Sequence, residues 1–135
     1  GYLKIIKDAI KEKKLDKMIK IFPPILGQDK SMAYNASEFI IIPSRFDTMT
    51  IVALEAGASS CPVIYTKNCD FNELEQKNSG IMVTKDSDCI AKAILEFKND
   101  EEKRLIYSSN IKKLVMEKYT WETVGKKFKE TLFTL

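Results

Sequence analysis

The stretch from Thr48 to Thr66 carries one charged residue, Glu55, among its nineteen. A carboxylate in a helix of this kind must be neutralised, hydrogen-bonded or given a ligand, because burying it unpaired is costly. Two interpretations are open. Glu55 either faces solvent or is satisfied by backbone N–H groups or a lysine, or it accepts the neighbouring hydroxyls of a ribose, since a carboxylate can accept two parallel O–H bonds.

Asp47 stands eight residues earlier, where a strand is expected to end and a helix to begin. An isolated Asp at such a place is typical of a helix N-cap. If the helix begins there, Asp47 and Glu55 lie roughly 12 Å apart along its axis, with the free N–H groups of the first turn beside Asp47. This arrangement suits a diphosphate at the helix start whose ribose reaches Glu55.

The chain contains no histidine, which excludes Ser-His-Asp and Cys-His nucleophile systems and zinc sites built with histidine. Its three cysteines, Cys61, Cys69 and Cys89, are odd in number and lack CxxC spacing. This pattern indicates neither a disulfide framework nor a metal site. We therefore expect no metal ion and no cofactor.

Hydrophobic patterning predicts strands that alternate with helices. The expected strands are 17–22, a run within 38–43 that suits burial on both faces, 63–65 and 80–83. The expected helices are 2–14, a short one from Asp29 or Ser31 to Ala36, the one after Asp47, one capped by Asp86 or Ser87, one from Asn99 or Asp100 to Lys118, and a last one opened by Thr120.

This alternation predicts an α/β fold, Rossmann-like, with a mostly parallel sheet of about four strands between two layers of helices. Ligands of such sheets lie beyond the carboxyl ends of the strands, here the segments 43–47 and 66–70.

With 135 residues, 44% hydrophobic, we expect one soluble domain. Gly57 and Pro62 interrupt the apolar stretch too early for a membrane span, and the charge of +3 is too balanced to demand a nucleic-acid partner, so we expect a cytoplasmic protein.

The segment PSRFDTMTIVALEAGASSCPVI, residues 43–64, resembles the carboxyl-terminal donor-binding domain of retaining GT-B glycosyltransferases of group 1, or family 4, which include glycogen synthases. In that family Pro-Ser-Arg-Phe-Glu ends a strand and a second Glu follows the first after seven residues. Here Asp47 takes the place of the first Glu, and Glu55 matches the second. Further matches lie at Pro62-Val63-Ile64, Asn72-Glu73-Leu74, Gly80-Ile81-Met82-Val83 and Tyr119-Thr120-Trp121.

The resemblance implies the donor-binding part of an enzyme that transfers a hexose from a UDP-, ADP- or GDP-sugar to a glycan or lipid acceptor. Glu55 would bind the ribose, Asp47 would be the catalytic residue beside the transferred sugar, and Arg45 would bind the donor. The backbone N–H groups that would meet the diphosphate are those of Thr48, Met49, Thr50 and Ile51.

The sequence also departs from the family pattern. Asp47 is one methylene shorter than Glu, Thr48-Met49-Thr50 replaces a triplet that contains glycine, and Cys69-Asp70 replaces Gly-Gly. These departures favour an alternative, a non-catalytic α/β module descended from such a domain that binds a nucleotide or a protein partner. The family's first strand-helix-strand unit and its amino-terminal acceptor domain would precede residue 1, so we expect 1–135 to be one partial domain that is inactive alone and self-associates through exposed sheet edges.

Overall fold

The structure is a computed structural model that describes residues 1–133, so the last two residues of the expected domain 1–135 lie outside it. Its sheet consists of three parallel strands in the order β1-β2-β3, namely β1 (Ile40–Ile42), β2 (Val63–Thr66) and β3 (Gly80–Val83). In the register, Tyr65 lies opposite Ile42 on one side and Met82 on the other. The α/β class and the parallel sheet are confirmed.

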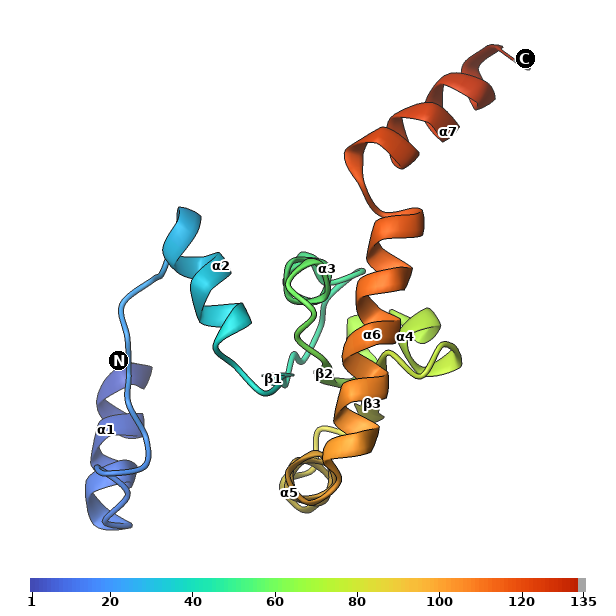
Figure 1. Cartoon of the computed structure of the whole chain (residues 1–135). Coiled ribbons are helices and arrows are strands. Elements are labelled where there is room, and N and C mark those ends of the chain that lie inside the picture. Colours follow the sequence, from blue (N-terminus) through green and yellow to red (C-terminus); the bar gives the residue numbers. More distant parts are fainter. Residues whose placement is uncertain (134–135) are drawn as a thin grey trace.

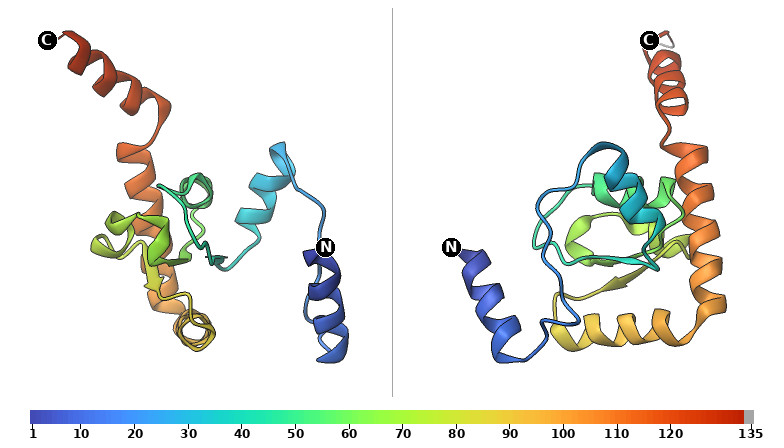
Figure 2. Two further views of the ribbon diagram at one scale, coloured as in Figure 1. Left: turned by 180° about the vertical axis from the view of Figure 1, so that it is seen from behind. Right: turned by 60° about the vertical axis from the view of Figure 1, so that its left-hand side comes forward.

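Helices cover both faces of this sheet, while the first and last helices extend away from it (Figure 1). Their bounds are α1 (Tyr2–Glu12), α2 (Gly27–Asn35), α3 (Ile51–Ala58), α4 (Asn72–Gln76), α5 (Ser87–Asn99), α6 (Glu101–Lys118) and α7 (Trp121–Phe133), with a 3₁₀ turn at Lys67–Cys69. α3, α4 and α6 pack against one face of the sheet, and α5 packs against the other. Figure 2 shows the same layers from two further sides.

The side chains of β2 alternate between two cores. Val63 and Tyr65 point into the core with α3 and α6, whereas Ile64 packs with Phe97 of α5. On the first side Gly57 of α3 is required by close packing, because a Cβ there would lie 2.7 Å from Val115 Cγ2 of α6. The sheet edge and α3 are therefore held in one tightly packed unit.

The strand expected at 17–22 is absent, so the sheet has three strands rather than about four. Residues 13–26 are irregular, and Met18 and Phe22 are exposed because no strand lies beside them to complete a ladder. β1 is consequently an edge strand. The expectation that it is buried on both faces is wrong, since α5 packs against β2 and β3 and leaves Ile41 38% exposed.

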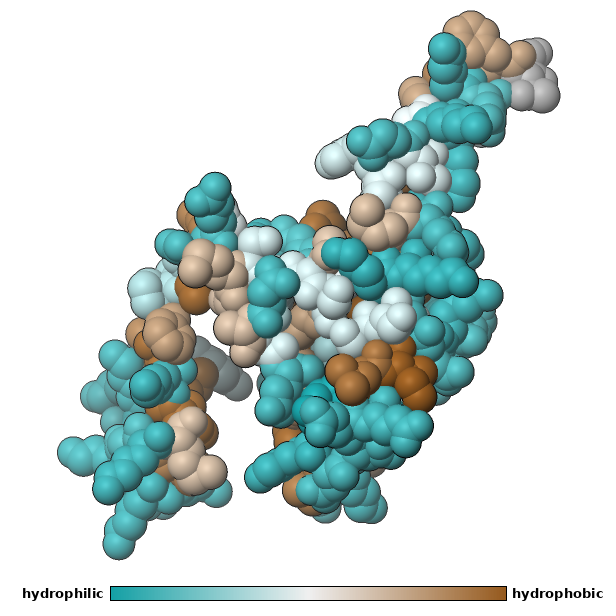
Figure 3. Space-filling view, in the orientation of Figure 1, coloured by the Kyte–Doolittle hydropathy of each residue, from teal (hydrophilic) through white to brown (hydrophobic). Residues whose placement is uncertain are grey.

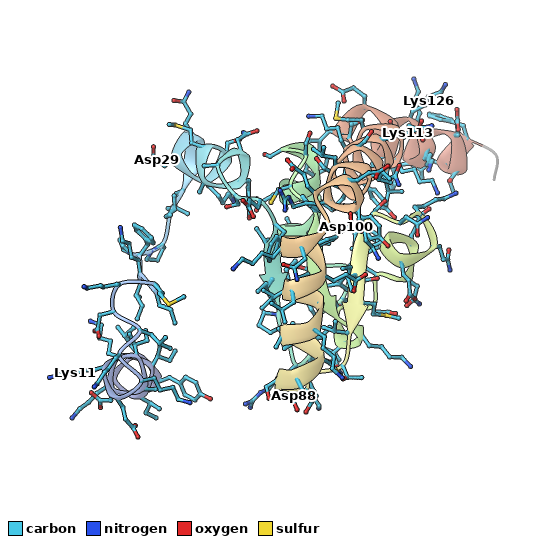
Figure 4. The ribbon with its side chains drawn as sticks, turned by 60° about the horizontal axis from the view of Figure 1, so that its bottom comes forward. Lys11, Asp29, Asp88, Asp100, Lys113 and Lys126 are labelled. Carbon is cyan, nitrogen blue, oxygen red and sulfur yellow. The ribbon has the colours of Figure 1, made fainter. Side chains whose placement is uncertain are left out.

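The amino-terminal helix stands apart from the sheet in all views. No residue of α1 is buried, although it has the predicted amphipathic pattern, and its apolar side chains lie uncovered in Figure 3. Figure 4 labels Lys11 at the end of α1 and Asp29 at the start of α2, both remote from α5, where Asp88 and Asp100 mark the two ends. α7 likewise extends beyond α6 with Trp121 exposed.

Candidate donor site at the carboxyl edge of the sheet

The two loops expected to carry the chemistry lie against each other at the carboxyl ends of β1 and β2. The Asp47 N–H donates to the carbonyl of Asn68 at 3.0 Å, and the Met49 N–H donates to the carbonyl of Cys69 at 3.1 Å. The Thr66 hydroxyl donates to the carbonyl of Ser44 at 2.6 Å. These bonds fix the segment 43–50, which leads directly into α3.

The N-cap of α3 is Thr50, not Asp47, so the helix begins later than expected. Asp47 Oδ1 accepts a hydrogen bond from the adjacent Thr48 N–H at 2.9 Å, a local turn that holds the chain out of the helix. Because helical rise counts only from Ile51, the 12 Å estimated between Asp47 and Glu55 does not apply, and the first residue of the helix, Ile51, lies about 6 Å from Glu55 along the axis.

The start of α3 has free hydrogen-bonding groups. Within residues 1–133, the N–H groups of Thr50, Ile51 and Val52 have no protein acceptor, whereas those of Thr48 and Met49 are occupied. The Thr50 hydroxyl is also without a partner in the described chain, although Thr50 is only 1% exposed. A buried hydroxyl with no partner is destabilising and is best explained by a ligand or an ordered water.

Met49 has a left-handed backbone conformation, with φ at +48°. Glycine adopts this conformation without steric cost, whereas a side chain disfavours it by roughly 1 kcal/mol or more. Thr48-Met49-Thr50 therefore follows a backbone path suited to glycine, although it contains none.

Glu55 lies on the α2 side of α3, where two donors meet its carboxylate. The Lys30 ammonium contacts Oε1 at 2.5 Å, and the Tyr34 hydroxyl donates to Oε2 at 3.2 Å. A lysine partner was one of the two interpretations left open by the sequence, and Lys30 occupies that position. The Glu55 side chain is still 33% exposed, so the carboxylate remains open to a ligand.

Glu55 also opens onto a hollow of about 220 Å³ between α2 and α3, lined by Gly27, Lys30, Ser31, Tyr34, Glu55, Ala58 and Ser59. Burial and the adjacent Glu55 carboxylate raise the pKa of Tyr34 to about 12, so its hydroxyl stays protonated and donates at neutral pH. The hollow therefore combines an aromatic ring, a cation and a carboxylate, groups that can hold a polar ring compound.

Arg45 and Glu55 do not line the same hollow. Arg45 lies beyond β1 and lines a different hollow, of about 550 Å³, with Pro43, Lys85 and Ile90. Lys85 follows β3 and was not among the residues predicted from the sequence, because the sequence does not show that the segments after β1 and β3 line one hollow.

A third cluster connects the loop after β2 with the carboxyl-terminal helices. Glu73 of α4 accepts hydrogen bonds from the Lys118 ammonium and from the Tyr119 hydroxyl, the latter at 2.6 Å, and these two bonds lower the pKa of the Glu73 carboxyl. Phe71 packs edge-on against Tyr119. Sequence reasoning missed this cluster, although Glu73 and Tyr119 both lie in segments that carry the family resemblance.

No group of three or more His, Cys, Asp or Glu side chains within residues 1–133 is placed to hold a metal ion. The three cysteines are free thiols, and burial raises the pKa of Cys61 to about 11, which keeps it protonated and unreactive. No described helix is both long and apolar enough to cross a membrane.

The known sequences that this chain resembles are described as glycosyltransferases. A family model described as Glycosyl transferases group 1 matches residues 3–100. An uncharacterized glycosyltransferase of Methanocaldococcus jannaschii is 32% identical over 102 residues, which cover 74% of this chain and 26% of the relative. A D-inositol 3-phosphate glycosyltransferase of Corynebacterium urealyticum is 22% identical over 129 residues, 94% of this chain and 30% of that protein. The chain thus spans less than a third of these relatives.

Solved structures show the same fold. Sucrose-phosphate synthase from Thermosynechococcus elongatus superposes with a TM-score of 0.82 at 20% identity, over 96% of this chain and 34% of that one. The carboxyl-terminal domain of a glycosyl transferase group 1 family protein from Francisella tularensis superposes with a TM-score of 0.79 at 28% identity, over 89% and 63%. The family match and the shared fold agree: the chain belongs to the group 1 glycosyl transferases and has the GT-B fold of their carboxyl-terminal domains.

Proposed function

We propose that this chain is the nucleotide-sugar-binding part of a retaining glycosyltransferase, which transfers a hexose from a nucleoside diphosphate sugar to a glycan or lipid acceptor. The observation that carries the proposal is the unpaired start of α3, with its free N–H groups and the buried, unpartnered Thr50 hydroxyl. Backbone donors at a helix start favour phosphate, because the helix dipole adds a partial positive charge there.

In this proposal the donor diphosphate lies over the start of α3. The Thr50 and Ile51 N–H groups are ready to donate, and the Thr50 hydroxyl gains its missing partner. Of the four N–H groups expected from the family resemblance, those of Thr48 and Met49 would first have to leave their present acceptors. Binding is therefore expected to reorder the segment 47–49.

Glu55 would accept the ribose hydroxyls. A carboxylate offers about four acceptor positions, and Lys30 and Tyr34 use two of them, so the ribose can bind without displacing either donor. The distance of about 6 Å along the axis between Ile51 and Glu55 is short enough for the ribose and the diphosphate of one nucleotide to reach both positions.

Asp47 would lie beside the transferred sugar. The reaction would then depend on positioning and on stabilisation of the leaving phosphate rather than on a protein nucleophile. The acceptor would be held by an amino-terminal domain outside this chain, in line with the much longer relatives. On this proposal residues 1–135 form one partial donor domain of a cytoplasmic enzyme, inactive on its own and without a nucleic-acid partner.

The unpaired edge of β1 supports a further part of the proposal, self-association of the isolated chain. Its backbone groups are free to pair with another strand, and 17–22 has the composition of a strand without pairing as one. We expect light scattering to show species larger than a monomer, and a strictly monomeric chain at high concentration would contradict this.

The second candidate is a non-catalytic module that binds a nucleotide or a protein. The left-handed Met49 without glycine, the occupied Thr48 and Met49 N–H groups and the Lys30–Glu55 pair favour it. If the enzyme is working but divergent, replacing Asp47 by Glu and Thr48 by Gly, with Thr50 kept, should raise turnover in the intact protein. Unchanged turnover in a folded double variant would support the module.

The experiment that tests the proposed function is a calorimetric titration of the intact protein with UDP-, ADP- and GDP-sugars, followed by a transfer assay. We expect one donor class to bind clearly more tightly than the others, and the product to keep the anomeric configuration of the donor. Absence of binding by all three classes would remove the donor-site assignment. An inverted product would remove the retaining mechanism only.

A further inference from the structure

A pair of cations lies at the carboxyl edge of the sheet, apart from Glu55. Arg45 follows β1 and Lys85 follows β3, with the central strand β2 between them. Both side chains line the hollow of about 550 Å³, whose other walls are Pro43 and Ile90. Ligands of parallel sheets bind at this edge, so the hollow is placed where a ligand is expected.

Neither cation is paired with an acid. Within residues 1–133, no ion pair joins Arg45 or Lys85 to a carboxylate. The acids next to them in sequence bind backbone instead: Asp47 accepts from the Thr48 N–H, and Asp86 caps α5 by accepting from two N–H groups of its first turn. The hollow therefore holds two positive charges and no acidic lining residue.

The hollow lies at the same edge of the sheet as the start of α3, but its helical wall comes from α5 and not from α3. Ile90 belongs to the first turns of α5, the same end of the helix that Asp88 marks in Figure 4. α5 packs on the Ile64 side of the sheet, whereas α3 packs on the Val63 side, and Figure 1 shows the two helices on opposite sides of the strands. No residue of α3 or of the segment 48–50 before it lines this hollow.

We propose that Arg45 and Lys85 bind the phosphate of a phosphomonoester at a second site, separate from the nucleotide site. A guanidinium presents parallel donors that match two phosphate oxygens, and an ammonium adds a point charge, so together they balance a dianionic phosphate. Pro43 and Ile90 give an apolar wall for the carbon skeleton of the ligand. The inference does not depend on the proposed donor function, because its probes contain no nucleotide.

The test is calorimetry on the intact protein at low salt with two probes, inorganic phosphate and glucose 6-phosphate. We expect binding that weakens about 3- to 10-fold in Arg45→Ala and in Lys85→Ala, a modest factor because both side chains are exposed. Lys92→Ala, which removes an exposed lysine of α5 outside the hollow, is the matched control and should keep the wild-type affinity. Thermal unfolding of each variant checks that the fold is retained.

The two probes distinguish the source of the phosphate. Tighter binding of glucose 6-phosphate assigns the site to a phosphorylated sugar, whereas equal binding assigns it to the phosphate group alone. Saturation with UDP should leave both affinities unchanged. The proposal is overturned if neither probe binds, if Lys92→Ala weakens binding as much as Lys85→Ala, or if UDP competes with the probes.

Discussion

Glu55→Gln tests the donor-site assignment with a substitution that keeps the size of the side chain. The Lys30 ammonium can still donate to the remaining amide oxygen, so the fold loses the charge of one ion pair and the acceptor of the Tyr34 hydroxyl, which can instead accept from the new amide group. Both partners are about one-third exposed, at 37% and 33%, so solvent screens the pair. Its loss should lower the free energy of unfolding by about 0.2–1 kcal/mol.

The effect on donor binding should be larger than the effect on folding. In the proposed complex, two bonds between a carboxylate and hydroxyls become weaker neutral bonds, and one amide hydrogen faces a hydroxyl hydrogen. This change is worth about 1–3 kcal/mol, or roughly 5- to 150-fold in the dissociation constant. Calorimetry with the preferred nucleotide sugar measures it, and thermal unfolding measures the loss of stability.

Lys30→Met is the matched control, because it breaks the same ion pair and leaves the carboxylate in place. It should melt slightly lower than the wild type, as Glu55→Gln does, while donor affinity stays the same or rises. If Glu55→Gln binds the donor as tightly as the wild type but melts many degrees lower, Glu55 is a structural acid. If Lys30→Met loses as much affinity as Glu55→Gln, the ion pair rather than the carboxylate supports binding.

Three further predictions concern the donor site and its supports. Thr50→Val removes the unpartnered hydroxyl, so calorimetry should show weaker donor binding, while the free energy of unfolding rises by up to about 1 kcal/mol. The control Thr131→Val on α7 should change neither quantity. Unchanged donor affinity in Thr50→Val would rule out a ligand contact at this hydroxyl. Gly57→Ala places a Cβ 2.7 Å from Val115, and the resulting shift of α6 should cost about 1–3 kcal/mol in urea unfolding; a neutral result would mean that α3 and α6 are loosely packed. Because the pKa of Glu73 is lowered in the folded chain, its carboxylate adds stability that is fully present above pH 4.5 and is lost as the pH falls through the depressed pKa. In Glu73→Gln the free energy of unfolding should therefore depend less on pH in that range. An identical pH dependence in the variant and the wild type would contradict the role of the Lys118 contact.

The sequence predicted best the elements whose signals are local. β2 and β3 have the expected apolar runs, and the cap of α5 at Asp86 follows from a single side chain that reaches two nearby N–H groups. The strand at 17–22 failed because a strand is completed by its neighbours, which no local pattern supplies. α3 began late because the Asp47 side chain binds the adjacent N–H instead of those of the helix.

The residues of the candidate site also fall into two groups: those that could be predicted from one local segment, and those that only the fold brings together. Asp47, Glu55 and the N–H groups that lead into α3 lie on one continuous segment, so their proximity could be inferred, whereas the late start of α3 changes their spacing. Lys30 meets Glu55 across 25 residues of sequence, and Lys85 shares a hollow with Arg45 only through the order of the strands. The Thr50 hydroxyl became informative only when its burial was known.

We expect this chain to bind a donor without catalysing its transfer, for an electrostatic reason. The start of a helix offers the equivalent of about half a positive charge, whereas a departing diphosphate carries more than one negative charge. The cations that could neutralise the rest, Arg45 and Lys85, line a hollow that no residue of α3 lines. Free N–H groups at α3 can thus hold a donor in its ground state without stabilising the leaving group enough for transfer. If the proposed donor site is correct, calorimetry on the 135-residue chain should show binding of a nucleotide sugar, whereas a donor-hydrolysis assay on the same chain should show no turnover; robust turnover would contradict this reasoning.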